Sequence, residues 1–155
     1  MRGKQASKRK IAPDPVYGST TVTRCINYLM LRGKRGLAEG FVYGALDSAA
    51  ATLKKKQIEV LDEALANIKP SLEVRSRRVG GASYQVPVAV DENRQEALAL
   101  RWLVKVVRSK KGKNITELLA AELINACKGE GDAVRMKEET ERMAEANKAF
   151  AHFRW

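Results

Sequence analysis

The sequence predicts a mainly α protein, a bundle of about six helices with one protruding β-hairpin arm. Two features of the sequence predict this fold. Apolar residues recur at helical spacing through most of the chain, whereas between residues 72 and 90 they recur at every second position. The 155 residues fit a single domain, 1–155, which is long enough to bury a core without disulfides or metal.

Three helices are expected before the hairpin. The first begins at residues 19–21 and ends at the basic loop 33–36, and the second covers about 37–55. The third ends before Pro70, which cannot continue a helix. The buried face of the first helix is expected to consist of Val22, Cys25, Ile26, Leu29 and Met30.

Residues 72–90 are expected to form the β-hairpin, because two alternating runs flank Gly80-Gly81. A lone two-stranded ribbon is only marginally stable, so its base must pack on helices while the rest projects. Tyr84 is expected to pack at that base. The first strand carries Arg75, Arg77 and Arg78.

Three more helices follow the hairpin, beginning near residue 91 or 92, after Asn114 and at Asp132. Trp102 is expected to pack on the core rather than to stack on a base. Residues 148–155 form an aromatic and basic C-terminal tail. On the fourth helix, one narrow arc holds Arg94, Arg101, Lys105 and Arg108.

The positive charge is concentrated rather than spread. The chain has 29 Lys and Arg against 18 Asp and Glu, a net charge of +11. Nine of the bases, with a single acid, lie in residues 1–35, and the excess recurs in 70–90 and 91–113. Residues 1–18 lack a helical period and are expected to form an extended basic N-terminal arm. Cations gathered on an arm, a ribbon and a helix predict a polyanionic partner, and nucleic acid fits best.

Candidate catalytic and metal-binding chemistry is sparse. His152 is the only histidine, and Cys25 and Cys127 lie far apart without a partner at metal-ligand spacing. We therefore expect no enzyme activity, no cofactor and no metal. No apolar run approaches the roughly 18 residues that cross a bilayer, so we expect no membrane partner. The residues alone leave RNA and DNA open, and a DNA-bending nucleoid protein with a basic β-ribbon arm is the alternative.

Four strings make the chain resemble a known family. They are DPVY at 14–17, VTRCINYLM at 22–30, RRVGGASYQVP at 77–87 and MAEANKAFAHFRW at 143–155. Together they resemble bacterial small-subunit ribosomal protein seven, and the resemblance covers essentially the whole chain. Cys25, where many relatives are expected to have an aromatic residue, is a minor departure within a buried helix.

The resemblance implies a structural constituent of the small ribosomal subunit in the cytoplasm. It implies primary binding to the 3′ major domain of small-subunit ribosomal RNA and nucleation of head assembly. It places the hairpin and C-terminal region near the exit-site tRNA and mRNA. It also implies contacts with neighbouring head and platform proteins.

Combined with the charge pattern, the resemblance implies two sets of binding residues. The residues expected to bind ribosomal RNA are Arg2, Lys4, Lys8, Arg9, Lys10, Lys34, Arg35, Arg75, Arg77, Arg78, Arg94, Arg101, Arg108, Lys110, Lys111 and Lys113. The residues expected near tRNA or mRNA are Arg78, Gly80, Gly81, Arg142, Lys148 and Arg154.

Overall fold

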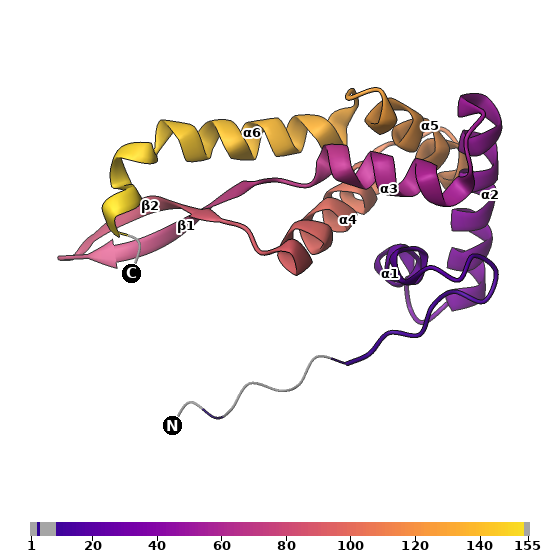
Figure 1. Ribbon diagram of the computed structural model, residues 1–155, viewed down its shortest axis with the longest axis horizontal. Helices are drawn as coiled ribbons and strands as arrows, with labels where there is room; N and C mark the ends of the chain where they lie inside the picture. Colours follow the sequence, from indigo (N-terminus) through magenta and orange to yellow (C-terminus); the bar gives the residue numbers. More distant parts are fainter. Residues whose placement is uncertain (1–2, 4–8, 154–155) are drawn as a thin grey trace.

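The computed structural model describes residue 3 and residues 9–153, and it shows a helical body with one projecting β-hairpin (Figure 1). The predicted fold class is thereby confirmed. In chain order the elements are α1 (Thr20–Leu29), α2 (Arg35–Leu53), α3 (Gln57–Ile68), β1 (Leu72–Val79), β2 (Ala82–Ala89), α4 (Glu92–Ser109), α5 (Ile115–Cys127), α6 (Asp132–Ala146) and the 3-10 helix η1 (Lys148–Phe153).

The hydrophobic core lies among α1 to α5 and the first turn of α6. Apolar residues at helical spacing give each helix one buried face, and removing those faces from water drives the packing. Trp102 is partly buried against this core, as expected. The largest fully buried apolar side chains are Ile26, Leu46, Leu61, Leu65, Ile68, Leu100, Leu103, Leu119 and Leu123.

Helix α2 differs from the expected range at both ends. It begins at Arg35 instead of 37, so Arg35 lies on a helix and not in a basic loop. The Arg35 Nε donates to Glu39 Oε1 at 2.8 Å, a pair one turn apart that supports the first turn. The helix ends at Leu53 instead of 55, because Lys54 adopts a left-handed conformation with φ 54°.

The expected extended arm over 1–18 is too long at its C-terminal end. Residues 15–17 form a turn, and Asp14 is buried beneath it. The Asp14 carboxylate accepts the backbone N–H groups of Val16 and Tyr17, both at 3.1 Å, as aspartates at turns often do. Among the described residues, the part of the arm without helix, strand or turn therefore ends before Asp14 or at it.

The hairpin has the turn that its glycines predict. Strands β1 and β2 are antiparallel, with Val79 opposite Ala82, so Gly80 and Gly81 form the connection. Their φ angles are 57° and 91°, and a type I′ turn needs positive φ at both positions. At the base of the hairpin, Val86 and Pro87 are buried.

The expectation that Tyr84 packs at the base of the hairpin is wrong. Tyr84 stands opposite Arg77, close to the turn, and its ring centroid lies 5.3 Å from Phe150 and 5.0 Å from Phe153. Residues 148–153 of the expected tail thus form η1, which packs on β2 (Figure 1). Apolar burial by three aromatic rings explains why this tail folds back.

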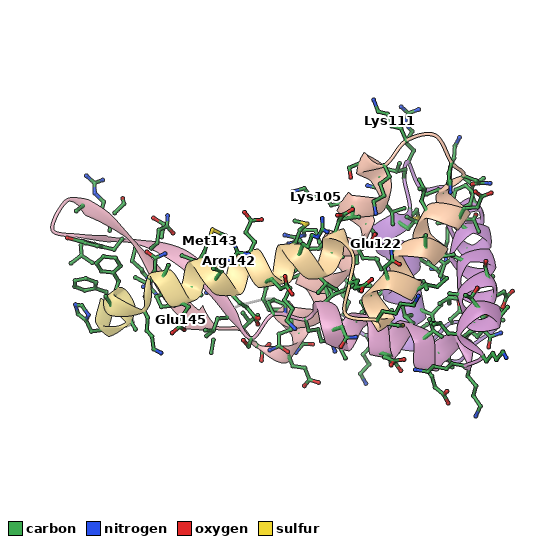
Figure 2. The ribbon with its side chains drawn as sticks, turned by 90° about the horizontal axis from the view of Figure 1, so that it is seen from above. Lys105, Lys111, Glu122, Arg142, Met143 and Glu145 are labelled. Carbon is green, nitrogen blue, oxygen red and sulfur yellow. The ribbon has the colours of Figure 1, made fainter. Side chains whose placement is uncertain are left out.

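A buried carboxylate fixes the start of α6. Glu122 on α5 is 0% exposed, and Figure 2 shows it between α5 and α6. Its Oε2 accepts from Lys110 Nζ at 2.7 Å and its Oε1 accepts from the Ala133 N–H at 2.9 Å. Lys110 also reaches Asp132, at 2.9 Å. The Lys110 hydrogen bond lowers the pKa of Asp132, so this carboxylate stays charged beside the ammonium.

Helix α6 in turn holds the base of the hairpin. Glu141 Oε1 accepts from the Ser71 backbone N–H at 2.8 Å and from its hydroxyl at 2.7 Å. Burial raises the pKa of Glu141, but these hydrogen bonds lower it more, so that the pKa lies below its usual value. Figure 1 shows α6 running beside the hairpin toward its tip. Within the described part of the chain, no helix combines the length and apolar character that crossing a membrane would need.

Gly131→Ala should destabilise the fold more than Gly129→Ala does. Both glycines have positive φ, 104° and 77°, but only at Gly131 would an added Cβ meet a neighbour, Glu122 Oε1 at 2.9 Å. We expect a loss of about 3 kcal/mol at Gly131 and about 1 kcal/mol at Gly129, measured by urea unfolding. Equal losses would show that the approach to Glu122 is unimportant.

Lys110→Ala should destabilise the fold, whereas its neighbour Lys111→Ala should not. Removing the Lys110 ammonium leaves the buried Glu122 carboxylate without its countercharge, and we expect a loss of about 2 kcal/mol. Lys111 is exposed, so its loss should change the free energy of unfolding by less than about 0.5 kcal/mol. Unfolding curves that coincide for Lys110→Ala and the wild type would contradict this assignment.

Candidate nucleic-acid interface

A basic hollow lies between α1 and α4. It has a volume of about 470 Å³ and is lined by Tyr28, Arg101, Val104, Lys105, Arg108 and Ser109. Because the three cations recur at spacings of three and four on α4, the helix presents them on one face. The side chains of Arg101 and Lys105 are exposed, which leaves them available to an anionic partner.

Arg108 has a structural role beside its place in the hollow. Its guanidinium donates to the Leu29 carbonyl at 2.9 Å, at the C-terminal end of α1. A cation at this end also matches the negative pole of the helix dipole. Arg108 therefore joins α4 to α1 and leaves part of its guanidinium facing solvent, since the residue is exposed.

The N-terminal arm reaches the same side of the molecule. A second hollow, of about 200 Å³, shares Tyr28 with the first and is otherwise lined by Ile11, Arg24, Asn93, Ala97 and Leu100. Arg24 is paired with Glu96 on α4. Arg9 and Lys10 are exposed and directly precede Ile11. Arg2, Lys4 and Lys8 lie outside the described residues.

The loop between α4 and α5 adds further cations. Lys111 and Lys113 are exposed, and Figure 2 shows Lys111 projecting on the same side of the body as Lys105. Lys110, which we expected to bind RNA as well, is engaged with Glu122 and Asp132. Burial lowers the pKa of Lys110, but these two hydrogen bonds raise it more, so that the pKa lies above its usual value. The charged ammonium therefore stabilises the fold.

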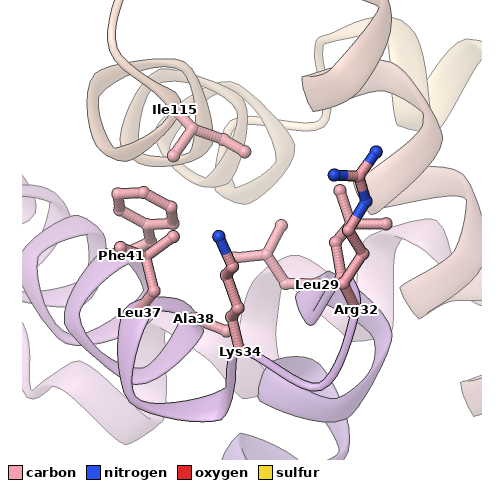
Figure 3. Close-up of a pocket in the computed structure, with 8 residues that line it drawn as sticks. Leu29, Arg32, Lys34, Leu37, Ala38, Phe41 and Ile115 are labelled. Carbon is pink, nitrogen blue, oxygen red and sulfur yellow. The ribbon is translucent and has the colours of Figure 1, made fainter.

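Lys34 lies at an apolar hollow instead of on a purely basic surface. Figure 3 shows its side chain between Phe41 and Leu29, pointing toward Ile115. The hollow has a volume of about 320 Å³, and Arg32 adds a second cation to its lining. An apolar hollow beside two cations can take a flat apolar group that carries an anion, as an unstacked nucleotide does. The sequence reasoning missed Arg32, although its proximity to Lys34 in the chain was a signal.

The hairpin arginines fall into two groups. Glu73 at the base of β1 is buried and accepts from Arg75 Nε at 2.6 Å and from Arg94 Nε at 3.3 Å. Arg75 and Arg94 therefore neutralise a buried carboxylate. Arg78 is exposed and Arg77 half-buried near the tip, where the described residues offer neither an ion pair.

The hairpin tip and η1, which carry several of the residues expected near tRNA or mRNA, lie at the far end of the molecule from α2 (Figure 1). Gly80, Gly81 and Arg78 belong to the tip, and Lys148 begins η1, which packs on β2. Arg142 is exposed on α6, where Figure 2 shows it close to Met143 and Glu145. Lys148 pairs with Glu145 at 3.0 Å. Arg154 is outside the described residues.

The described part of the chain carries the histidine and the two cysteines, both of which are free thiols. Among the residues that the structure describes, no group of three or more His, Cys, Asp or Glu is arranged to hold a metal ion. Burial raises the pKa of the Cys25 thiol to about 12, so it stays protonated at neutral pH. His152 is exposed on η1, and its Nδ1 is 2.9 Å from the Ala149 carbonyl oxygen.

Comparisons with known proteins give a consistent family for the chain. The family model described as ribosomal protein S7p/S5e matches residues 1–148. Proteins named small ribosomal subunit protein uS7 from Fervidobacterium nodosum and Thermotoga maritima are each 52% identical over 155 residues, covering 100% of both chains. The protein of that name from Gemmatimonas aurantiaca is 54% identical over 154 residues, covering 99% of both chains. The chain therefore belongs to the ribosomal protein S7p/S5e family, and it is a structural, non-enzymatic component of the small ribosomal subunit.

Proposed function

We propose that the chain is a primary binder of the 3′ major domain of small-subunit ribosomal RNA and nucleates assembly of the subunit head. A bacterial small-subunit ribosomal protein works in the cytoplasm and binds ribosomal RNA together with other ribosomal proteins. The observation that carries the finer proposal is the hollow between α1 and α4, where Arg101, Lys105 and Arg108 share one face. Cations on one rigid surface fit phosphates whose positions are fixed by a folded RNA.

The residues proposed to bind RNA separate by what they already contact. Those whose side chains stay open to the partner are Arg9, Lys10, Lys34, Arg77, Arg78, Arg101, Lys111 and Lys113. Those that also hold the protein together, and so act on RNA from fixed positions, are Arg35, Arg75, Arg94, Arg108 and Lys110.

We also propose that the hairpin tip and the C-terminal region approach the exit-site tRNA and mRNA. The support is geometric: η1 packs on β2, which brings Lys148 and the tip glycines to one end of the molecule. The same end is where neighbouring head and platform proteins are proposed to meet the chain, because the C-terminal region lies there.

Removing cations from the basic hollow should weaken RNA binding and flatten its salt dependence. For Arg101→Ala with Lys105→Ala, we expect the slope of log K against log salt to fall by about 1 to 2, because each phosphate contact contributes roughly 0.7–0.9. The measurement is filter binding to a 3′ major domain fragment across a salt series. The matched control is Lys69→Ala with Lys128→Ala, which removes equal charge from the ends of α3 and α5.

Equal slopes for the two double variants would mean that only total charge matters, which contradicts a defined interface. Duplex DNA of the same length tests the DNA-bending alternative in the same assay. Tighter binding to duplex DNA than to the RNA fragment would favour that alternative.

Arg77 and Arg78, the two outer hairpin arginines, should contribute to RNA binding and not to folding. We expect Arg77→Ala with Arg78→Ala to weaken RNA binding several-fold while the helical circular dichroism stays unchanged, because neither side chain has a described ion-pair partner. Arg75→Ala is the comparison, since it leaves Glu73 with Arg94 alone and should lower the free energy of unfolding. Loss of helical signal in the Arg77 and Arg78 variant would show that these residues are structural.

A further inference from the structure

Asp14 is an unusual residue for its place in the chain. It is the only acid within the first 35 residues, and yet it is 1% exposed. A buried carboxylate is costly unless hydrogen bonds satisfy it. Asp14 Oδ1 accepts from the Tyr43 hydroxyl of α2 at 2.7 Å, and Oδ2 accepts from the Val16 and Tyr17 N–H groups. The turn that follows the basic arm is therefore fastened to α2 by Asp14.

The backbone of this turn is closed by the same residue. The Asp14 N–H donates to the Ser19 carbonyl at 3.1 Å, and the Gly18 N–H donates to the Asp14 carbonyl at 2.7 Å. Burial comes first among the causes that raise the pKa of Tyr43 to about 12, followed by the hydrogen bond to Asp14. The phenol consequently remains a donor at every physiological pH.

Two more contacts hold the residues that precede Asp14 against the body. The Thr23 hydroxyl of α1 donates to the Ala12 carbonyl at 3.1 Å, and Thr23 is buried. Ile11 then lies in the hollow lined by Asn93 and Ala97 of α4. Figure 1 shows the segment before α1 looping past α2 and then running away beneath the body. Residues 11–14 are thus held at α2, at α1 and at α4 in turn.

This route decides where the arm leaves the body. Arg9 and Lys10 directly precede Ile11, which shares a hollow with Ala97, and Ala97 lies one helical turn from Arg101 in the basic hollow. We propose that Asp14 is a positioning residue for RNA binding: with Thr23, it holds the base of the arm so that Arg9 and Lys10 extend the cationic face of α4. The inference rests on the proposed function and adds to it the residue that sets the direction of the arm.

Holding residues 11–14 in place reduces the conformational freedom that the arm loses when it binds RNA. A free cationic tail must be ordered along its whole length when it contacts phosphates, and that entropy loss opposes binding. A segment already held at residues 11–14 loses less. The contacts of Arg9 and Lys10 should therefore contribute more affinity when Asp14 and Thr23 are intact.

A double-mutant cycle tests this coupling. Arg9→Ala with Lys10→Ala is introduced into the wild type, into Asp14→Ala and into Thr23→Val, and each protein is titrated with the 3′ major domain fragment. We expect the loss of affinity caused by the arm substitutions to be at least about threefold smaller in the Asp14→Ala and Thr23→Val backgrounds. The matched control is Thr140→Val, which removes a hydroxyl bonded to the Met136 carbonyl on α6 and should show no coupling.

Two readouts separate positioning from general loss of structure. Thr23→Val keeps the shape of a buried side chain, so it decides the question if Asp14→Ala fails to fold. In the free protein, trypsin should cleave the bond after Lys10 faster in both variants than in the wild type, whereas Thr140→Val should not change this rate.

Equal affinity losses in all backgrounds, or unchanged cleavage, would overturn the inference. It is equally overturned if the arm substitutions cost the wild type nothing. In each of these cases, steep salt dependence of wild-type binding would still support the proposed function. Salt-independent binding by the wild type would instead contradict the proposed function itself.

Discussion

Glu122 connects the helical body to α6 and, through α6, to the hairpin. With no exposed surface, its carboxylate is satisfied by the Lys110 ammonium at the end of α4 and by the Ala133 N–H in the first turn of α6. These bonds fix where α6 starts. Helix α6 then holds the base of the hairpin through Glu141 and Ser71. The direction of the hairpin therefore depends on a charge buried far from its tip, because a rigid helix transmits the constraint.

Buried carboxylates also explain why the net charge overstates the number of cations that are available to RNA. Some cations that the charge pattern marks for RNA are needed inside the protein: Lys110 compensates Glu122, and Arg75 and Arg94 compensate Glu73. Removing Lys110 leaves Glu122 without its countercharge, and removing Arg75 or Arg94 leaves Glu73 with a single partner. A loss of RNA binding in such variants would therefore reflect folding as well as contact. Arg101 and Lys105 differ because they are exposed on the surface of a well-packed helix.

The sequence predicted what depends on local pattern and missed what depends on distant partners. Period-3.6 burial of Ile26 and Leu29 and the Gly80-Gly81 turn follow from neighbouring residues, and both were found. The burial of Asp14 was not, because its partner Tyr43 is 29 positions away and nothing in DPVY indicates it. The pairing of Lys110 with Glu122 was missed for a related reason, since Glu122 lies in another helix and appears in the sequence as an ordinary helical acid.

The hairpin and the N-terminal arm both project from the body, and they are held to it in different ways. The hairpin has α6 along its side and η1 packed on β2, where Tyr84 meets Phe150 and Phe153, so its outer half is ordered before any partner arrives. Within the described residues, the arm is fastened to the body as far as Ile11. An ordered hairpin selects an RNA by shape, since it cannot adapt without losing its packing. Arg9 and Lys10 precede these contacts and can follow a phosphate backbone of varied course, at a greater cost in conformational entropy. In the proposed function, shape selection therefore belongs to the hairpin and body, whereas the arm adds affinity that the position of Asp14 directs toward α4.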